Sequence, residues 1–315
     1  MKKRVLTLLI LSVAISVLLL SCSSQGPSSN ASNSVAGFQG LTMELKVART
    51  DFLISDSQKE FTLPFTLIVK NSGFYTVSKN GAVLQVSGYD PSLIMSTKKN
   101  MNVQQIKEAM QGKSTTRPIG DMKVFSGSDF GLTFSNLDSI TDSYDFDLFF
   151  NLCYKYATSF SSSIRLAPIT DLNLANDVNI RNSISFSQGQ GAPLAITGID
   201  IYPSSKEVFL TIHVKQKSGK LIYYPDKFST DECGSIDFSE RNKFKVASAT
   251  LSGVGGDCGN DKNNYFYLDD NGNGQIACKF ELNNEITSPM TSILSLNLEY
   301  YVFDSLSQRF SIRKI

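Results

Sequence analysis

The chain has few of the side chains on which enzymes most often rely. Its 315 residues include one His, no Trp and five Cys, and neither a Gly-x-Ser-x-Gly nucleophile motif nor a Cys-x-x-Cys pair occurs. A serine hydrolase needs a His beside a nucleophile and an orienting acid, and a zinc site needs closely spaced Cys and His residues. The sequence therefore gives no support for catalysis, and we predict a protein that is not an enzyme.

The chain also lacks an excess of charge. Lys and Arg number 30 against 29 Asp and Glu, a net charge of +1, and this turns slightly negative if Lys2, Lys3 and Arg4 leave with a leader peptide. Binding to a phosphate backbone needs a basic surface, so we expect no nucleic-acid partner. With 41% hydrophobic and 19% charged residues, the composition is that of a globular protein, and the length is typical of about two domains.

Long apolar runs are absent except at the N-terminus. Basic residues 2–4 precede the uncharged stretch 5–20, and Leu19-Leu20-Ser21-Cys22 then places a small residue before a cysteine. This pattern is a lipobox, which predicts a cleaved lipoprotein signal peptide at 1–21 and lipidated Cys22 as the new N-terminus. The protein would be exported and held by its lipid on the extracellular or periplasmic side of the membrane. An ordinary cleaved signal peptide and an uncleaved membrane helix are the alternatives.

A short polar segment follows the predicted lipidation site. Residues 22–36 are rich in Ser and hold no large apolar side chain, which is typical of a flexible tether. Asn30-Ala31-Ser32 is the chain's N-x-Ser/Thr sequon, so Asn30 is a candidate glycosylation site if the organism has the machinery.

The rest of the chain alternates apolar and polar residues in short runs that are rich in Val, Ile, Phe, Thr and Tyr. Clusters of Gly, Asn, Asp, Ser and Pro separate these runs. The pattern predicts an all-β protein, and Pro64 indicates a strand start or an edge. We expect strands at residues 41–47, 61–69, 82–86, around 123, 131–134, 145–158, 179–186, 194–202, 207–216, 243–252, 264–268, 275–282, 292–303 and 309–313.

One helix and one domain boundary interrupt this pattern. Val103, Ile106 and Met110 suit one face of a short helix within 101–112, and two glycines and a proline at 189–193 indicate the boundary. The prediction is therefore two immunoglobulin-like β-sandwich domains, at residues 37–190 and 191–315.

Four segments resemble a group of uncharacterised secreted or lipid-anchored surface proteins of small-genomed archaea, which are built from β-sandwich modules. The segments are Phe38-Gln-Gly-Leu-Thr-Met43, Val86-Ser-Gly-Tyr-Asp-Pro91, Leu152-Cys-Tyr-Lys-Tyr-Ala-Thr158 and Gly191-Ala-Pro-Leu-Ala-Ile196. The resemblance spans most of the mature chain. It implies a fold and a location, and it assigns no catalytic residue.

Four cysteines remain after Cys22, an even number in a chain predicted to be exported, where disulfides are favoured. Three pairings are open. We favour Cys258 with Cys278, which lie at the two ends of a predicted hairpin, and Cys153 with Cys233 would then link the two domains. The alternative for Cys153 is a buried free thiol within an apolar strand.

Asp269-Asp-Asn-Gly-Asn-Gly-Gln-Ile276 matches the start of a calcium loop, with oxygen side chains from Asp269, Asn271 and Asn273. The match fails at its twelfth position, where Phe280 replaces the required Glu. A hairpin turn rich in Gly and Asn explains the same residues without a metal, and it is the favoured interpretation. No cofactor is expected apart from this candidate calcium ion, for which nearby Asp257 and Asp261 are further candidate ligands.

The remaining polar and aromatic candidates have simpler structural explanations. His213 lies in an alternating run and is predicted to be a strand-surface residue, while Asp142, Asp145 and Asp147 offer carboxylates that a glycosidase could use. The pairs Tyr223-Tyr224 and Tyr300-Tyr301 place one ring on each face of a strand, so one ring of each pair could contact a sugar or a partner.

The function that these observations favour is non-enzymatic. We expect a lipid-anchored cell-surface protein with a structural, adhesive or protein-interaction role, and with a surface protein or a glycan as its partner. An envelope lipoprotein that binds a small ligand or calcium is the first alternative, and an extracellular hydrolase is the second.

Overall fold

The structure, a computed structural model, describes residues 37–94, 102–168, 183–225, 228–229, 233–259 and 263–315. These residues form β-strands and three short 3₁₀ helices, with no α-helix among them. The strands are β1 (Leu41–Lys46), β2 (Asp51–Ile54), β3 (Phe61–Thr62), β4 (Thr66–Asn71), β5 (Ala82–Ser87), β6 (Val103–Gln105), β7 (Met122–Ser126), β8 (Thr133–Phe134), β9 (Ser143–Leu166), β10 (Ser183–Ser185), β11 (Leu194–Pro203), β12 (Glu207–Gln216), β13 (Leu221–Tyr223), β14 (Lys243–Leu251), β15 (Val254–Cys258), β16 (Tyr265–Tyr267), β17 (Asn273–Glu281) and β18 (Met290–Lys314). The 3₁₀ helices are η1 (Pro91–Leu93), η2 (Leu137–Ser139) and η3 (Phe238–Glu240).

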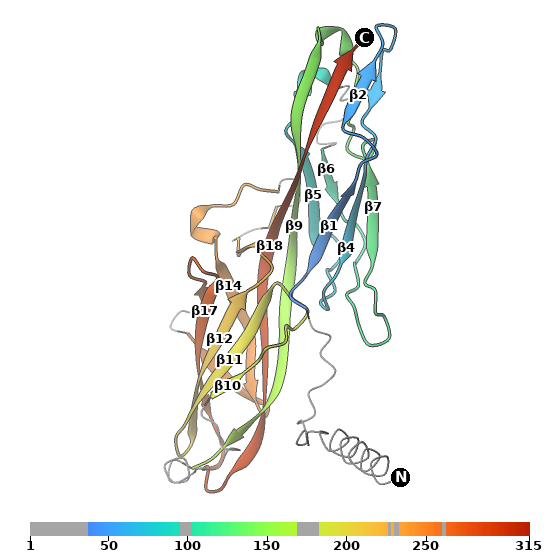
Figure 1. Cartoon of the computed structure of the whole chain (residues 1–315). Helices are drawn as coiled ribbons and strands as arrows, with labels where there is room; N and C mark the ends of the chain where they lie inside the picture. Colours follow the sequence, from blue (N-terminus) through green and yellow to red (C-terminus); the bar gives the residue numbers. More distant parts are fainter. Residues whose placement is uncertain (1–36, 95–101, 169–182, 226–227, 230–232, 260–262) are drawn as a thin grey trace, which may run out of the picture. The chain divides into compact units, whose positions relative to one another are not determined.

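Two long antiparallel strands organise the fold. Strand β9 has 24 residues and β18 has 25, and they pair along their whole length from Met290 opposite Leu166 to Arg313 opposite Ser143. Alternating burial along both strands explains their length, because nearly every second side chain enters a core. Figure 1 shows both strands running past the N-terminal and the C-terminal sets of strands.

The N-terminal strands form a layer against β9. Strands β1, β4 and β7 make a three-stranded antiparallel sheet, while β5 pairs with β9 and β6 pairs with β5. Leu41, Leu67 and Val69 are fully buried in the cluster that also contains Leu84 of β5. The expected strand at 61–69 is divided at Pro64 into β3, which pairs with β8, and β4, which belongs to the three-stranded sheet.

The C-terminal strands extend the sheet that contains β9 and β18. From the far edge the order is β10, β11, β12, β17, β15, β14, β18 and β9, and every neighbouring pair is antiparallel. Inward-facing side chains such as Ile212, Ile276 and Leu298 are fully buried in the same cluster as the N-terminal core. One side of β11, β12 and β17 therefore faces the core, and the other side faces solvent.

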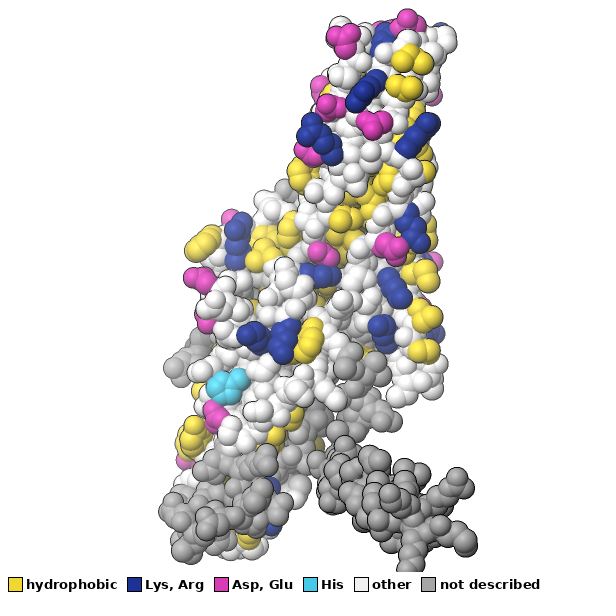
Figure 2. Space-filling model, in the orientation of Figure 1, with side chains coloured by type: hydrophobic (Ala, Val, Ile, Leu, Met, Phe, Trp, Pro, Cys, Tyr) yellow, Lys and Arg dark blue, Asp and Glu magenta, His cyan; other side chains and the backbone are white. Residues whose placement is uncertain are grey.

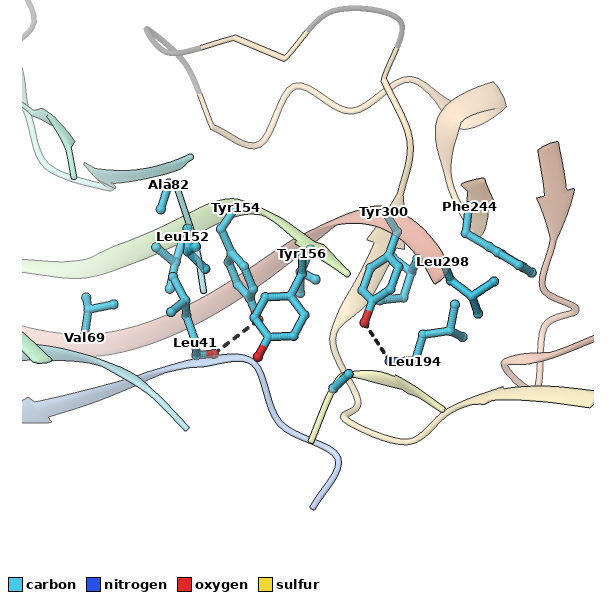
Figure 3. Packing of buried hydrophobic residues seen from close by; sticks show 14 of the residues in the cluster. Leu41, Val69, Ala82, Leu152, Tyr154, Tyr156, Leu194, Phe244, Leu298 and Tyr300 are labelled. Carbon is cyan, nitrogen blue, oxygen red and sulfur yellow. Dashed lines mark hydrogen bonds between the residues drawn. The ribbon is translucent and has the colours of Figure 1, made fainter. Parts of the chain in front are cut away.

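Three buried tyrosines lie close to one another on β9 and β18 (Figure 3), and Tyr156 and Tyr300 connect the two halves of the chain, residues 37–190 and 191–315. The Tyr154 hydroxyl donates to Leu41 O at 3.2 Å, and the Tyr156 hydroxyl donates to Gly191 O at 3.3 Å. The Tyr300 hydroxyl accepts from Leu194 N at 3.3 Å and lies 2.9 Å from Thr158 Oγ1. Since the Thr158 hydroxyl donates back to Leu194 O at 2.5 Å, Tyr300, Thr158 and the Leu194 backbone close a ring of hydrogen bonds.

The predicted helix within 101–112 is wrong for the part that the structure describes, residues 102–112. Val103–Gln105 form β6, Ile106 N donates to Ala82 O at 3.0 Å, and Met110 bridges Val77. Ile106 and Met110 are buried, as the helix would have required. The spacing of these residues indicates that they are buried, and an irregular strand edge can bury them as well as a helix can.

The segment that was predicted as the domain boundary is buried. Residues 191–196 are inaccessible, and Gly191 adopts a φ of +64° with Phe74 so close that a Cβ would lie 1.6 Å from its Cδ2. Residues 34–315 form one compact unit. Strand β18 of the second predicted domain pairs with β9 of the first, so the division at residues 190 and 191 stays a prediction.

Candidate functional site

The solvent side of β10, β11, β12 and β17 carries the most varied set of exposed functional groups that the sheet brings together. We call it the outer face, and its members are Ser183, Ser185, Gly198, Asp200, Tyr202, Glu207, Phe209, Thr211, His213, Gln275, Ala277, Lys279 and Glu281. Strand alternation places these residues on one side, and the register aligns them, with Gly198 opposite His213 and Tyr202 opposite Phe209.

His213 and Asp200 form the polar centre of the outer face. His213 Nε2 lies 2.6 Å from Asp200 Oδ2, and the two side chains are 34% and 27% exposed. The register that runs without interruption from Pro203 opposite Val208 to Gly198 opposite His213 sets this alignment. Gly198 has no side chain under the imidazole, where a Cβ would lie 3.5 Å from His213 Cδ2. The single histidine, cyan in Figure 2, lies at the surface with an acidic side chain close by.

The environment of Asp200 favours its charged form. The hydrogen bond from His213 is the main cause that lowers the pKa of Asp200, and a hydrogen bond from the Ser183 hydroxyl lowers it further. A hollow of about 400 Å³ lies beside this pair. Its lining is mostly polar, and consists of Ser183, Ser185, Thr197, Gly198, Asp200, His213, Val214, Asn273, Gly274 and Gln275.

Two exposed aromatic rings extend the outer face beyond the hollow. Tyr202 is 55% exposed and Phe209 is 43% exposed, and they are partners across β11 and β12. Lys279 Nζ lies 6.0 Å from the Phe209 ring centroid. Glu207 at 2.8 Å and Glu281 at 3.0 Å hold this ammonium group, and their hydrogen bonds raise the pKa of Lys279 to about 12.

The geometry of this site differs from that of a Ser-His-Asp triad. In a Ser-His-Asp triad the histidine contacts the nucleophile, whereas the Ser183 hydroxyl bonds to Asp200 and His213 Nε2 faces the same carboxylate. The groups around the hollow are hydrogen-bond donors and acceptors of mixed kind, next to apolar rings. Such a surface suits a ligand that presents both hydroxyl groups and apolar faces.

Both favoured cysteine pairings are present. Cys258 and Cys278 are opposite each other in β15 and β17 and form a disulfide with a Cα–Cα distance of 4.1 Å. Cys153 of β9 bonds to Cys233, which is 80 residues away in sequence, with a Cα–Cα distance of 5.6 Å. Cys153 is also buried, in a small cluster with Val83. Two disulfides are compatible with an oxidising compartment.

The candidate calcium loop forms a tight turn. Asp269 Oδ1 accepts hydrogen bonds from Asn271 N at 2.9 Å and Asn273 N at 2.8 Å. These bonds, chiefly the one from Asn273, lower the pKa of Asp269. No cluster of three His, Cys, Asp or Glu residues suited to a metal occurs in the described parts of the chain. Asp257 is exposed on β15, Asp261 lies outside the described residues, and calcium at this turn stays a prediction.

The three aspartates that a glycosidase could use lie at an exposed strand. Asp145 and Asp147 project from the solvent side of β9, and Asp142 precedes the strand. Asp145 Oδ2 is 3.8 Å from Arg309 Nη2 on β18. These carboxylates therefore lie along a strand surface and do not line the hollow beside His213.

The pair Tyr300-Tyr301 divides between the core and the surface, as its alternation predicts, whereas Tyr223 is opposite Tyr301 in register and lies outside the main core cluster. Tyr300 is fully buried and Tyr301 is half-buried, while Tyr223 is buried and Tyr224 is half-buried. Tyr301 contacts three other rings, with centroid distances of 5.7 Å to Tyr223, 5.7 Å to Tyr224 and 4.9 Å to Phe228. These rings contact mainly each other. Tyr202 and Phe209 are more exposed than they are, as are Tyr267 at 59% and Phe238 at 88%.

The N-terminal predictions fall outside the described residues. They are the signal peptide at 1–21, lipidated Cys22, the tether at 22–36 and the sequon at Asn30. Within the described ranges, no helix is long and apolar enough to cross a membrane. Comparison with protein-family models and with curated protein sequences finds no match.

Sequence reasoning placed His213 correctly on a strand surface but missed its partner and the adjacent rings. Asp200 and Tyr202 occupy alternate positions of a run that looks like any half-buried strand. Asp200 and Tyr202 could have been identified by pairing the predicted strands 194–202 and 207–216 as a hairpin, because this pairing brings Tyr202 opposite Phe209.

Proposed function

We propose that the protein is a non-enzymatic, lipid-anchored cell-surface protein that makes adhesive contacts through the outer face. The observation that carries this proposal is the pair of exposed rings, Tyr202 and Phe209, next to the polar hollow around Asp200 and His213. It is unfavourable to expose large aromatic side chains to water. Exposed aromatic side chains that lie together on one face are typical of binding surfaces.

Export and anchoring belong to the same proposal. The lipobox at Leu19–Cys22 supports lipidation, and two disulfides support an oxidising location. We include in this proposal two immunoglobulin-like sandwiches, as in the archaeal surface proteins that the chain resembles. The all-β architecture with its large antiparallel sheets supports this part of the proposal.

Anchoring is tested by partitioning cell proteins into detergent and by mass spectrometry of the N-terminal peptide. The unchanged chain should enter the detergent phase and begin at Cys22 with an added lipid mass, whereas Cys22→Ala should do neither. Ser24→Ala, two residues away, is the matched control and should behave as the unchanged chain does. A parent chain without added lipid mass at Cys22 would contradict the lipid anchor.

Adhesion is tested with lipid vesicles that carry the purified protein and are mixed with envelope preparations of the cells that produce it. Vesicles with the unchanged chain should co-sediment with the envelopes, and the double variant Tyr202→Ala, Phe209→Ala should not. Phe149→Ala is the matched control, because Phe149 is 42% exposed on β9, almost the same as Phe209. Equal co-sedimentation of the parent and the double variant would exclude the outer face as the adhesive surface.

Capture of a small polar molecule is the second candidate function. The hollow of about 400 Å³ beside the His213–Asp200 pair favours it, since this volume is within the range of small-ligand sites.

A further inference from the structure

We propose that the outer face is a carbohydrate-binding site for a neutral oligosaccharide. The inference rests on the proposed function and names the chemical class of its ligand. A pyranose ring presents apolar C–H groups on its faces and hydroxyl groups around its rim. It therefore needs a flat aromatic surface and, close by, donors and acceptors that lie at its edge.

Tyr202 and Phe209 supply the aromatic surface. They belong to neighbouring strands and are directly opposite in register, so their side chains leave the sheet from adjacent points. Both are about half exposed, and the backbone beneath them is fixed by the pairing of β11, β12 and β17. A rigid ring on a paired strand loses little conformational freedom when a ligand packs on it.

Asp200, His213 and Gln275 supply the polar groups. Asp200 is two residues from Tyr202 on the same side of β11, a separation of about 7 Å. His213 lies opposite both Gly198 on β11 and Gln275 on β17. A carboxylate, an imidazole and an amide thus surround one end of the aromatic surface, and together they can both donate to and accept from hydroxyl groups.

The charges on this face indicate a neutral ligand. The Asp200 carboxylate is paired with His213, and the Lys279 ammonium group is paired with Glu207 and Glu281. Three carboxylates thus share this face with one ammonium group, so an acidic ligand would be repelled. A basic ligand would compete with Lys279 and His213 for these carboxylates, whereas a hydroxyl group can add to the existing hydrogen bonds.

The length of the site favours a chain of sugars over a single one. Thr211 lies between His213 and Phe209 on β12 and opposite Asp200, which makes the face continuous from the hollow to the rings. Four residues of β12 separate His213 from Phe209, a distance of about 13 Å. One oligosaccharide could therefore place one sugar unit in the hollow and another on the two aromatic rings at the same time.

The test is calorimetric titration of the purified protein with four neutral probes, each used separately: cellohexaose, maltohexaose, mannohexaose and chitohexaose. We expect saturable binding of at least one probe. Tyr202→Ala should weaken that binding about tenfold or more, because truncation of a central aromatic contact has effects of this size. Asp200→Asn, which preserves shape but replaces with an amide the carboxylate that bonds His213, should also weaken it.

Phe149→Ala is again the matched control and should bind as the parent does. Circular dichroism must show that every variant keeps the β-sheet spectrum and melting temperature of its parent within a few degrees. Absence of saturable binding to all four probes would overturn the proposal. Binding that persists unchanged in both Tyr202→Ala and Phe209→Ala would overturn it as well.

The envelope experiment separates this inference from the proposed function. If periodate treatment of the envelopes, which cleaves sugar diols, abolishes co-sedimentation, the ligand is a carbohydrate. If protease treatment abolishes it and periodate does not, the partner is a protein: the carbohydrate inference fails and the adhesive function stands. If the vesicles never co-sediment and no probe binds, both fail.

Discussion

Removing the hydroxyl of Tyr300 tests the hydrogen-bonded junction between the two halves. In the structure, Leu194 N donates to this hydroxyl at 3.3 Å, and Thr158 Oγ1 lies 2.9 Å from it. The Tyr300→Phe variant keeps the buried ring but leaves the Leu194 N–H without this acceptor. A buried donor that loses its partner costs about 1–3 kcal/mol, so we expect the free energy of unfolding to fall by that amount.

The neighbouring residue provides the control. Tyr301 lies on the opposite side of the same strand and is half-buried, so Tyr301→Phe removes a hydroxyl from a partly solvated position. Its effect should stay within about 0.5 kcal/mol. Urea unfolding followed by circular dichroism gives both values by linear extrapolation. Equal losses in the two variants would refute the reasoning, because they would show that the ring of hydrogen bonds around Leu194 contributes nothing particular.

Two further predictions concern the disulfides and alkaline pH. Replacing both cysteines of the Cys153–Cys233 pair with Ala should lower the free energy of unfolding by about 4.5 kcal/mol, and the same change at Cys258–Cys278 should lower it by about 3 kcal/mol. The first disulfide closes a loop of 80 residues and the second a loop of 20, and the longer loop loses more entropy on closure. Urea unfolding of the two double variants measures these losses, and the reverse order would contradict the loop-closure argument. Burial raises the pKa of Tyr300 above its ordinary value, so the stabilisation it provides is complete below about pH 10 and is lost as pH rises towards the higher folded-state pKa. The urea midpoint should therefore fall between about pH 9 and about pH 12, and a constant midpoint would count against a buried, neutral phenol.

Much of the β architecture could be predicted from the sequence, because apolar and polar residues alternate along a strand with the same two-residue period as buried and exposed side chains. The run Leu41–Val47 became β1, and the turn at Asn80-Gly81 precedes β5, with Asn80 at a φ of +59°. Strand β15 was missed because its Gly-Gly pair weakens any strand signal. Strand β15 is stabilised by its pairing with β14 and β17 and by the disulfide at Cys258, and these contacts are not visible in its own sequence.

The candidate site was less predictable for a related reason. His213 and Asp200 are 13 residues apart, and their contact depends on the register in which β11 pairs with β12, from Pro203 opposite Val208 to Gly198 opposite His213. A shift of one residue reverses which side chains face solvent, and no local pattern announces it. The sequence thus predicts that each residue lies on a strand, but the neighbours of each side chain depend on pairing between strands.

The pairing of β9 with β18 also determines the order in which the molecule can assemble. Thr158 and Tyr300, which meet across these strands, are 142 residues apart, and β5 covers the other edge of β9. During synthesis, residues 143–166 therefore wait with one open edge until residues 290–314 have been made. Contacts of such long range form slowly, and neither half can close its core early. We therefore expect both halves to complete their cores only after residues 290–314 are available to pair with β9.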